Sequence, residues 1–371
     1  MRKITHFGPL PDPFAKPDGT WMTAEEWYAR REQLRDFVVD HEFGGMPPKP
    51  EVVTVTPLNT FHRGEICNWY QIAAGTKERQ IRFLMELYLP HEADCLEGGK
   101  APVLLTCDLC YANLESDTVA EALKRGYAVA GFNRLELAAD CPEVRSGGLY
   151  DVYPENKSFT GMAAWAWGFV ACMDALAQLP WVDETQVGVT GHSRGGKTAM
   201  LAAVVDERIQ YCCPNNSGCH GAVSYRTYVT GQGEQEQVSE RLGNMLDMFP
   251  HWMGEKLYAY RDREQDLPYD MHYFGALIAP RYYLQCEGQQ DYWINPIGAW
   301  QNLMAVKACF KRLGCEDHVG GWFRPGTHRQ KFPDFVQFMD FMDRARAGLP
   351  LSEHLQVNPY PIVEKNFHWD E

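Results

Sequence analysis

The chain has 371 residues, of which 45 % are hydrophobic and 13 % aromatic, a composition that favours a packed domain over a disordered chain. Its 35 Lys and Arg against 49 Asp and Glu give a formal net charge of −14, which argues against nucleic acid or an anionic membrane as a partner. No apolar run is long enough to span a membrane and no signal peptide is visible, so we expect a cytoplasmic protein unless a leader has been removed.

The cysteines do not suggest a disulfide framework or a metal site. The chain contains 12 Cys, but it is large and shows no secretory signal, so reduced thiols are expected. Cys107 and Cys110 form a single Cys-x-x-Cys pair, and no second pair follows at the spacing of a zinc site. We therefore expect neither a bound metal nor an organic cofactor.

The first hundred residues predict one helix followed by antiparallel strands. Residues 23–41 begin with a Thr cap and a Glu three residues later, and their apolar side chains recur at helical spacing, which predicts a helix ending before Gly44. Three runs of strand character follow, separated by short polar turns, and predict strands over 51–56, 66–74 and 81–89.

From residue 102 the pattern changes to strands that alternate with helices. Strands are predicted over Val103–Cys107, Tyr127–Phe132, Gln186–Thr190, Ile209–Cys213, Arg281–Glu287 and 319–323. Helices are predicted near 115–125 and over Phe159–Leu179, 297–313 and 332–346. This alternation indicates an α/β fold, a three-layer sandwich with a mostly parallel central sheet.

We expect a single domain over residues 1–371. Residues 1–100 would supply the N-terminal helix and the antiparallel strands, 101–350 the core, and 351–371 a C-terminal tail. An insertion from about 220 to 275 is rich in aromatic residues and would lie over the strand ends as a lid or a pocket wall.

The most informative motif follows the predicted strand Gln186–Thr190. Gly191-His192-Ser193-Arg194-Gly195 is a G-x-S-x-G pentapeptide with an apolar strand before it and an Ala-rich helical segment after it. Strand, sharp turn and helix are the context of a nucleophile elbow, in which the glycines let the helix pack close to the strand. Ser193 is therefore the predicted nucleophile, and the alternative is a structural Gly-rich turn.

In an open parallel sheet, working groups lie beyond the carboxyl ends of the strands, and this rule selects a base for Ser193. His328 follows the strand 319–323 across a short loop that can carry an imidazole back toward the serine. His318 precedes the same strand and would lie at the opposite edge of the sheet. His328 is therefore the predicted general base.

The same rule selects an acid. Asp291 lies in the loop after the strand Arg281–Glu287, and a carboxylate there can hold the imidazole in the right tautomer. Glu287, nearer the strand end, is the reserve candidate. The chain order Ser193, Asp291, His328 is that of the α/β-hydrolase fold, which is the fold that we expect.

The charge beside the predicted nucleophile is positive. The backbone N–H of Arg194 is placed to donate to an oxyanion, and Lys197 lies one helical turn beyond Ser193. Two cations here, in a chain of net −14, predict a local reversal of sign that suits an acidic or hydroxyl-rich acyl group. The alternative for both side chains is a solvated helix face.

The motif around the serine resembles that of a known family. The run from Gly191 to Lys197 is similar to the G-C-S-R-x-G-K signature of glucuronoyl esterases, carbohydrate esterase family 15. The resemblance covers nearly the whole chain. Some segments are similar to the family's N-terminal region, and others are similar to its bacterial members. The segments that carry it are Leu10–Phe14, Trp27 with Arg30 and Arg31, Phe43–Pro47, Phe249–Trp252, Leu267–His272 and Ala276–Arg281.

The resemblance implies roles for several residues around the serine. Arg194 would add a side-chain hydrogen bond to the oxyanion, and Lys197 would bind hydroxyls of the glucuronoyl ring. The other implied substrate-binding residues are Arg226 with the preceding Tyr225 near the pocket, and Trp293 or its neighbour Tyr292 against the 4-O-methyl group of the uronate.

Two departures separate this chain from the fungal members. Their catalytic acid is a Glu that opens an E-S-G segment, whereas this chain has Asn216-Ser217-Gly218, which leaves the loop acid Asp291 in the layout of bacterial members. The Cys beside the nucleophile, disulfide-bonded in fungal enzymes, is His192 here.

Together these expectations describe a serine esterase that acts through an acyl-enzyme on esters of glucuronic or 4-O-methylglucuronic acid, carried by a small molecule or an oligosaccharide. The nearest alternative is an esterase that removes acetyl or cinnamoyl groups from sugars or small molecules. The alternative from another class is a catalytically silent carbohydrate-binding relative, which the amide at Asn216 suggests.

Overall fold

The computed structural model describes residues 3–90, 99–111, 114–156, 158–230 and 239–370. Within these ranges the main feature is a sheet of nine strands: β2 (Val52–Arg63), β3 (Glu65–Gly75), β4 (Gln80–Tyr88), β5 (Ala101–Thr106), β6 (Ala128–Phe132), β7 (Val182–His192), β8 (Tyr211–Asn215), β10 (Tyr282–Gly288) and β11 (Val319–Arg324).

The strand order is β11-β10-β8-β7-β5-β6-β4-β3-β2. The strands from β11 to β6 in this order pair in parallel, and β4, β3 and β2 continue the sheet as antiparallel neighbours. The parallel part therefore brings the ends of six strands, and the loops that follow them, to one edge of the sheet.

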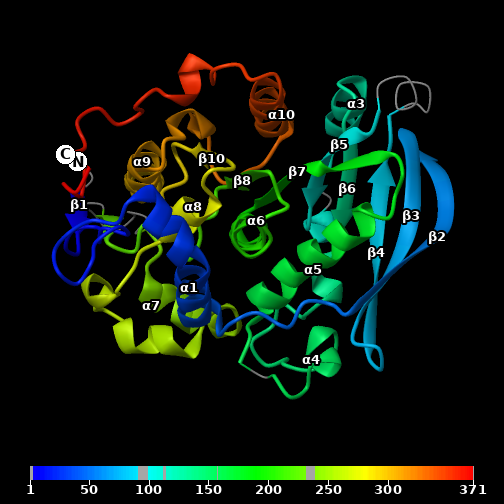
Figure 1. The fold of residues 1–371 in the computed structure, drawn as a ribbon, viewed down its shortest axis with the longest axis horizontal. Helices are drawn as coiled ribbons and strands as arrows, with labels where there is room; N and C mark the ends of the chain where they lie inside the picture. The colour runs from blue at the N-terminus through cyan, green and yellow to red at the C-terminus, as the bar shows by residue number, and fades with distance from the viewer. Residues whose placement is uncertain (1–2, 91–98, 112–113, 157, 231–238, 371) are drawn as a thin grey trace.

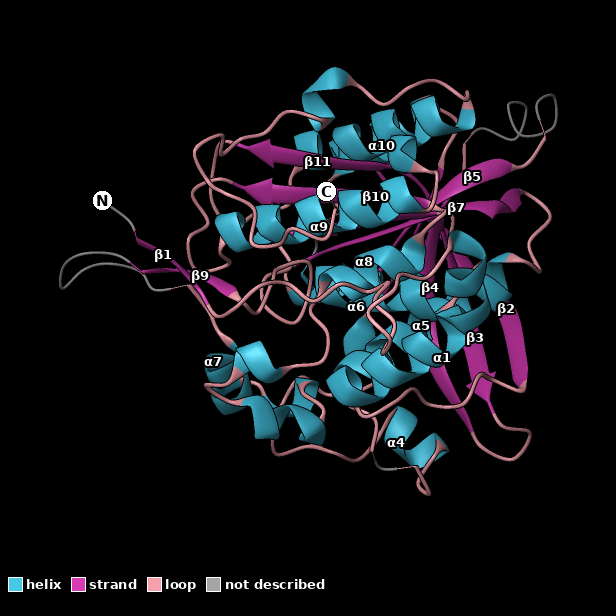
Figure 2. Cartoon of the chain, turned by 60° about the vertical axis from the view of Figure 1, so that its left-hand side comes forward, coloured by secondary structure: helices cyan, strands magenta, loops and turns pink. Residues whose placement is uncertain are grey.

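Helices cover both faces of this sheet (Figure 1). One face carries α3 (Ser116–Lys124) and α10 (Phe332–Arg346), whose apolar side chains share a buried cluster with the strands. The other face carries α5 (Gly161–Leu176), α6 (Arg194–Val205), α8 (His272–Ile278) and α9 (Pro296–Arg312). Figure 2 shows β10 and β11 passing between α9 and α10. The three layers confirm the predicted α/β sandwich.

Two helices show why the sequence folds as it does locally. In α1 (Ala24–Phe43), Thr23 and Glu26 form a reciprocal capping box, and Gly44 ends the helix with a φ of 69°. In α5 every residue except Asp174 is buried, which explains its run of Ala and Trp and its lack of a polar face.

The predicted elements of the core agree with the structure to within a few residues at most ends. The structure adds a two-stranded antiparallel pair, β1 (Lys3–His6) with β9 (Thr227–Thr230), which projects at one side of the molecule (Figure 2). It also adds three short helices, α4 (Leu149–Val152), α7 (Leu242–Met248) and α8. The predicted insertion contains β9, α7 and several single helical turns.

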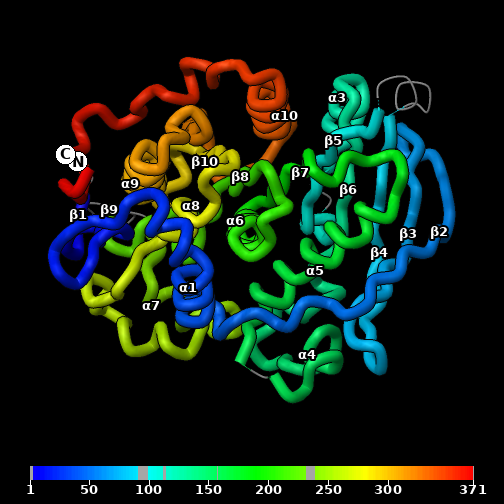
Figure 3. The backbone as a smooth tube through the Cα atoms, in the orientation of Figure 1, coloured from blue at the N-terminus to red at the C-terminus, as the bar shows by residue number. Residues whose placement is uncertain are grey.

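The C-terminal segment runs from α10 across the molecule to α9 (Figure 3). There Gln301 donates to Glu364 O at 2.6 Å and Arg312 donates to Trp369 O. Among the described helices, none combines the length and apolar character that a membrane span requires. The cytoplasmic location, the lack of a nucleic-acid partner and the single domain stay predictions.

Candidate active site

Ser193 stands between β7 and α6, in the sharp turn that the sequence predicts. Its backbone has a φ of 56° and a ψ of −119°, a conformation that residues with a side chain rarely adopt. The Ser193 N–H donates to Asn215 O at 2.9 Å, and the Lys197 N–H donates to Ser193 O at 3.1 Å. These two bonds hold a strained, partly exposed serine at the carboxyl end of β7.

The glycines on either side of Ser193 allow this turn. A Cβ on Gly191 would lie 2.5 Å from the backbone of Gly195, so the start of α6 touches the end of β7. A Cβ on Gly195 would collide with the carboxylate of Asp108, which follows β5. Both positions therefore require glycine, as a nucleophile elbow does.

The carboxylate beneath the elbow belongs to a fully buried ion pair. Asp108 Oδ2 accepts the His192 N–H at 2.7 Å, and Arg134 Nη1 donates to Asp108 Oδ1. Both side chains are 0 % exposed, and the guanidinium faces the rings of Tyr111 and Trp165. Burial raises the pKa of Asp108 and Arg134 opposes that rise. Neither residue was predicted, although Asp108 directly follows a strand at the edge where working groups gather.

His328 and Asp291 meet as the sequence predicts. His328 Nδ1 lies 2.6 Å from Asp291 Oδ2, and the Asp291 side chain is 7 % exposed against 39 % for His328. An ionised carboxylate can only accept, so Nδ1 carries the proton and the lone pair remains on Nε2. This is the tautomer that a general base needs.

The His328 ring packs against His192, the neighbour of the nucleophile in the chain. Its centroid is 4.3 Å from that of His192, the residue that precedes Ser193. Within the described residues no hydrogen bond joins Ser193 Oγ to His328, and such contacts often tighten only when substrate binds. Burial and the neighbouring His328 lower the pKa of His192 to about 4, so His192 is neutral beside the base near pH 7.

The reserve acid Glu287 does not reach the imidazole. It is 0 % exposed in β10, and its Oε1 accepts from Gln285 Nε2 at 3.2 Å, while Oε2 has no hydrogen-bond partner among the described residues. Burial and the negative charge of Asp291 raise the pKa of Glu287, which favours its neutral form. The sequence offered two carboxyl groups as partners for His328, and in the structure Asp291 makes this contact.

Asn216 is a second hydrogen-bond partner of Asp291. Asn216 Nδ2 donates at 2.7 Å to Asp291 Oδ2, the same oxygen that His328 contacts. The Asn216 residue is fully buried, has a φ of 43°, and donates its backbone N–H to Cys286 O at 2.8 Å. The residue that replaces the fungal acid is therefore a hydrogen-bond donor to the loop acid.

The loop that carries His328 is enclosed by Arg324. The guanidinium donates to Asp334 Oδ1 at 2.7 Å, to Thr327 O at 3.4 Å and to Arg329 O. Asp334 is buried, caps α10 through the Lys331 N–H and accepts from Asn215. These bonds fix the backbone on both sides of His328, and the sequence reasoning missed them.

Arg194 follows the nucleophile, and its side chain lies among aromatic rings. The guanidinium carbon is 4.8 Å from the ring of Trp252, 5.8 Å from that of Phe249 and 6.0 Å from that of Tyr111. Arg194 Nη1 donates to Asp140, a residue that the sequence reasoning did not single out. Phe249 and Trp252 belong to the predicted insertion, which therefore forms one wall of the site, as expected.

Lys197 is buried rather than solvated, so the alternative of an exposed lysine is wrong. Its ammonium donates to Ser217 O at 2.5 Å and to Cys219 O, and lies 3.7 Å from Glu240 Oε1. Glu240 also accepts the Cys219 N–H at 2.6 Å. Burial raises the pKa of Glu240, and the positive charge of Lys197 opposes that rise.

The predicted local reversal of sign is also wrong, because each cation beside the serine has a carboxylate partner. Arg194 is paired with Asp140 and Lys197 with Glu240. The sequence could not reveal these pairs, since Asp140 and Glu240 come from separate loops and follow no motif.

Tyr225 and Arg226 are not brought to the serine. The Arg226 guanidinium is buried and donates to Tyr269 O, Gln265 O and Leu267 O and to the Asp270 carboxylate. The Tyr225 hydroxyl is buried too and donates to Glu42, which also accepts from His220 and Tyr269. These bonds hold both side chains in the protein interior. The prediction that they contact substrate is therefore wrong.

Tyr292 and Trp293 directly follow Asp291 and are partly exposed. The Trp293 carbonyl accepts the Glu240 N–H at 2.8 Å, which places these two residues beside the Lys197–Glu240 pair. Their contact with a uronate stays a prediction. Over the part of the chain that the structure describes, no cluster of three His, Cys, Asp or Glu could hold a metal ion.

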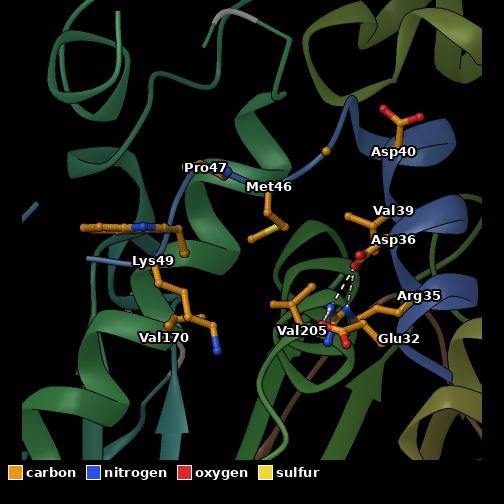
Figure 4. Close-up of a pocket in the computed structure, with 12 residues that line it drawn as sticks. Glu32, Arg35, Asp36, Val39, Asp40, Met46, Pro47, Lys49, Val170 and Val205 are labelled. Carbon is orange, nitrogen blue, oxygen red and sulfur yellow. Dashed lines mark hydrogen bonds and ion pairs between the residues drawn. The ribbon is translucent and has the colours of Figure 1, made fainter. Parts of the chain in front are cut away.

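A pocket of about 440 Å³ lies elsewhere, between α1 and α5 (Figure 4). Its floor is apolar, with Met46, Val170 and Val205, and its rim carries Arg35, bonded to Glu32 and Asp36. No predicted site residue lines it, so this pocket is separate from the candidate active site.

Comparison with known proteins gives consistent matches over most of the chain. The family model described as glucuronyl esterase, fungi, matches residues 72–314. A 4-O-methyl-glucuronoyl methylesterase from Wolfiporia cocos is 28 % identical over 344 residues, which cover 90 % of this chain and 80 % of the relative.

Solved structures agree with these matches. A carbohydrate esterase family 15 glucuronoyl esterase from Caldicellulosiruptor kristjansonii superposes with a TM-score of 0.82 at 28 % identity, over 96 % of each chain. A glucuronoyl esterase mutant from Sporotrichum thermophile, in complex with methyl 4-O-methyl-β-D-glucopyranuronate, shares the fold with a TM-score of 0.73. The identity to that mutant is 21 %, over 95 % of this chain and 92 % of the other.

Proposed function

Because the chain belongs to the glucuronyl esterase family, we propose that it hydrolyses esters of glucuronic or 4-O-methylglucuronic acid through a serine acyl-enzyme. The observation that carries the mechanism is the geometry around Ser193. The serine occupies a strained turn, the His328 ring packs against the preceding residue His192, and Asp291 is hydrogen-bonded to Nδ1 of His328. The methyl glucuronate ester bound by the Sporotrichum thermophile enzyme supports the acyl group.

The first half-reaction forms the acyl-enzyme. His328 Nε2 takes the proton of the Ser193 hydroxyl while Oγ attacks the ester carbonyl. The carbonyl oxygen becomes an oxyanion that accepts hydrogen bonds from the backbone N–H and the side chain of Arg194. Asp291 stabilises the imidazolium that forms. Collapse of the tetrahedral intermediate breaks the bond to the leaving alcohol, which receives its proton from His328.

The second half-reaction releases the acid. A water molecule loses a proton to His328 Nε2 and attacks the acyl carbonyl, which gives a second oxyanion in the same position. Collapse then breaks the bond to Ser193 Oγ, which regains the proton from His328. The products are one uronic acid and one alcohol for each ester and water consumed, and the free enzyme is restored.

Binding of the uronate ring is assigned to the region beside the triad that contains Lys197 and Glu240. The Lys197 ammonium has three N–H donors, of which Ser217 O and Cys219 O accept two, so one is left for a sugar hydroxyl. The Glu240 carboxylate can accept a further hydrogen bond. Trp293 and Tyr292 lie next to this pair and supply apolar surface for the ring.

Ser193→Ala tests the reaction. Release of acid from methyl 4-O-methyl-glucuronate should fall by about 10⁶-fold, because loss of the nucleophile leaves only binding and oxyanion stabilisation. The fold should be unchanged by circular dichroism. A variant that keeps more than a few per cent of turnover would mean that another residue is the nucleophile.

Two comparisons test the substrate and the alternatives. The wild-type kcat/KM for the glucuronate ester should exceed that for an acetylated sugar by at least ~100-fold, and the reverse preference would identify an acyl esterase. A serine-directed fluorophosphonate should label the wild type and not Ser193→Ala. A wild type that resists labelling would identify a silent carbohydrate-binding relative.

A further inference from the structure

Asp140 lies in the loop after the short helical turn η2 (Arg134–Glu136) and collects three hydrogen bonds. Its carboxylate accepts from Arg194 Nη1, from His251 Nε2 at 2.9 Å and from Trp252 Nε1 at 2.8 Å. The side chain is 10 % exposed. Burial opposes ionisation, but the three donors outweigh it and lower the pKa of Asp140 to about 2. The carboxylate is therefore charged near neutral pH.

The three donors come from different parts of the chain. Arg194 opens α6, whereas His251 and Trp252 form the single helical turn η3 (Pro250–Trp252) in the insertion. The loop before Asp140 is held in place by Trp165, whose Nε1 donates to Ala138 O at 2.9 Å. Asp140 thus joins the nucleophile helix and the insertion to a loop fixed against α5.

One edge of the Arg194 guanidinium is fixed by this arrangement and the other is open. Nη1 is bonded to Asp140 and the flat face lies over Trp252, while Nη2 and Nε make no hydrogen bond among the described residues. The side chain keeps 29 % of its surface exposed. An unrestrained arginine loses rotamer entropy before it can donate in one direction.

We propose that Asp140 is a positioning residue, which holds the Arg194 guanidinium beside Ser193 so that its open edge faces the oxyanion. This inference rests on the proposed function, in which Arg194 donates to that oxyanion. Donors that are already oriented need no reorganisation during the reaction, and stabilisation of the oxyanion by such donors is usually the largest single contribution to the rate. Asp140 itself contacts neither substrate nor nucleophile and acts through Arg194. The insertion contributes by holding Asp140 from the other side.

A double-mutant cycle tests the proposal with Asp140→Asn, Arg194→Met and the double variant. Removal of an oxyanion donor lowers kcat by about 10²–10³-fold, which is the loss expected for Arg194→Met. Asp140→Asn keeps the size of the side chain and should lower kcat by roughly 10–100-fold with KM within about threefold. Because Asp140 acts through Arg194, the double variant should match Arg194→Met within about threefold.

The matched control is Asp174→Asn, which removes a carboxylate bonded to Arg208 Nη1 at 2.5 Å. Asp174 lies on α5, thirteen residues or about 20 Å beyond the Gly161 end that packs against His251. Its kcat should equal that of the wild type. If Asp140→Asn does not fold, the cycle is run with Asp140→Glu, which keeps the charge but displaces it, and the same non-additivity is expected.

Three outcomes would overturn the proposal. They are a kcat of Asp140→Asn above half the wild-type value, multiplicative losses in the double variant, and an unchanged kcat in Arg194→Met. Multiplicative losses would show that Asp140 supports the fold and not the arginine. None of these outcomes would change the proposal that the protein is a serine ester hydrolase. That proposal fails if Ser193→Ala remains active.

Discussion

Lys197→Met removes one member of a buried ion pair and keeps the aliphatic stem. The Lys197 ammonium and the Glu240 carboxylate lie 3.7 Å apart, with 3 % and 4 % of their side chains exposed. Removing one partner of a buried pair costs about 3–5 kcal/mol, because the other charge stays buried and uncompensated. With an unfolding entropy of about 2.1 cal/mol/K per residue over 371 residues, this corresponds to a fall in Tm of roughly 4–6 °C.

The partner variants show whether the loss comes from the pair. Glu240→Gln should cost less, since the ammonium keeps the Ser217 and Cys219 carbonyls. The double variant leaves no unpaired charge, so its destabilisation should fall short of the sum of the single losses by about 1–3 kcal/mol. The matched control is Lys100→Met, which opens the half-exposed pair with Glu184 and should shift Tm by less than ~1 °C.

The same variant separates substrate binding from folding. A hydrogen bond from a charged donor to a sugar hydroxyl contributes about 1.5–3 kcal/mol, so Lys197→Met should lower kcat/KM for a glucuronate ester by roughly 10–100-fold. Hydrolysis of p-nitrophenyl acetate, which offers no hydroxyl, should be nearly unchanged at a temperature well below Tm. Equal losses on both substrates would restrict Lys197 to the fold, and additive Tm changes would refute the ion-pair reasoning.

Asp291→Asn should lower kcat by about 10⁴-fold with little change in KM, because the imidazole loses its orienting carboxylate while binding contacts survive. Glu287→Gln, which removes no contact to His328, should stay within about tenfold, and the opposite ranking in steady-state kinetics would move the acid to Glu287. The free energy of unfolding should fall by up to about 3 kcal/mol between pH 6.5 and 4 because of His272. Burial lowers the pKa of His272 to about 4, so in this range the unfolded chain binds a proton that the folded chain does not. Tm should then depend less steeply on pH in His272→Gln than in the wild type, and identical slopes would assign the acid sensitivity to other groups.

The triad residues could be predicted because local pattern and topology both constrain them. The elbow is a contiguous motif, and its glycines meet the backbone contacts that the motif requires. His328 and Asp291 follow strands, and the ends of parallel strands meet at one edge of the sheet. Only the structure could show whether Asp291 or Glu287 is the partner of His328, because both lie at the end of the same strand.

The charged partners could not be predicted because no local pattern marks them. Asp140 and Glu240 reach the site from loops, and their contacts depend on how those loops fold over the sheet. Arg226 was predicted to contact substrate, but its guanidinium donates to carbonyls of the loop 265–270. This loop is about forty residues away in the chain, so the sequence did not reveal the contact. Asp108 alone carried a usable signal, its place directly after the predicted strand Val103–Cys107.

The pairing of Arg194, Lys197 and Arg324 with carboxylates has a consequence for the reaction. The Arg194–Asp140 and Lys197–Glu240 pairs present oriented donors with little net charge, and the charge of Arg324 is balanced by Asp334. A neutral ester gains from oriented donors at short range and gains little from a long-range positive field. The uronate product is an anion, and an unpaired cation beside Ser193 would hold it after hydrolysis. Paired cations keep the donors that stabilise the transition state and remove the excess charge that would slow release of the acid.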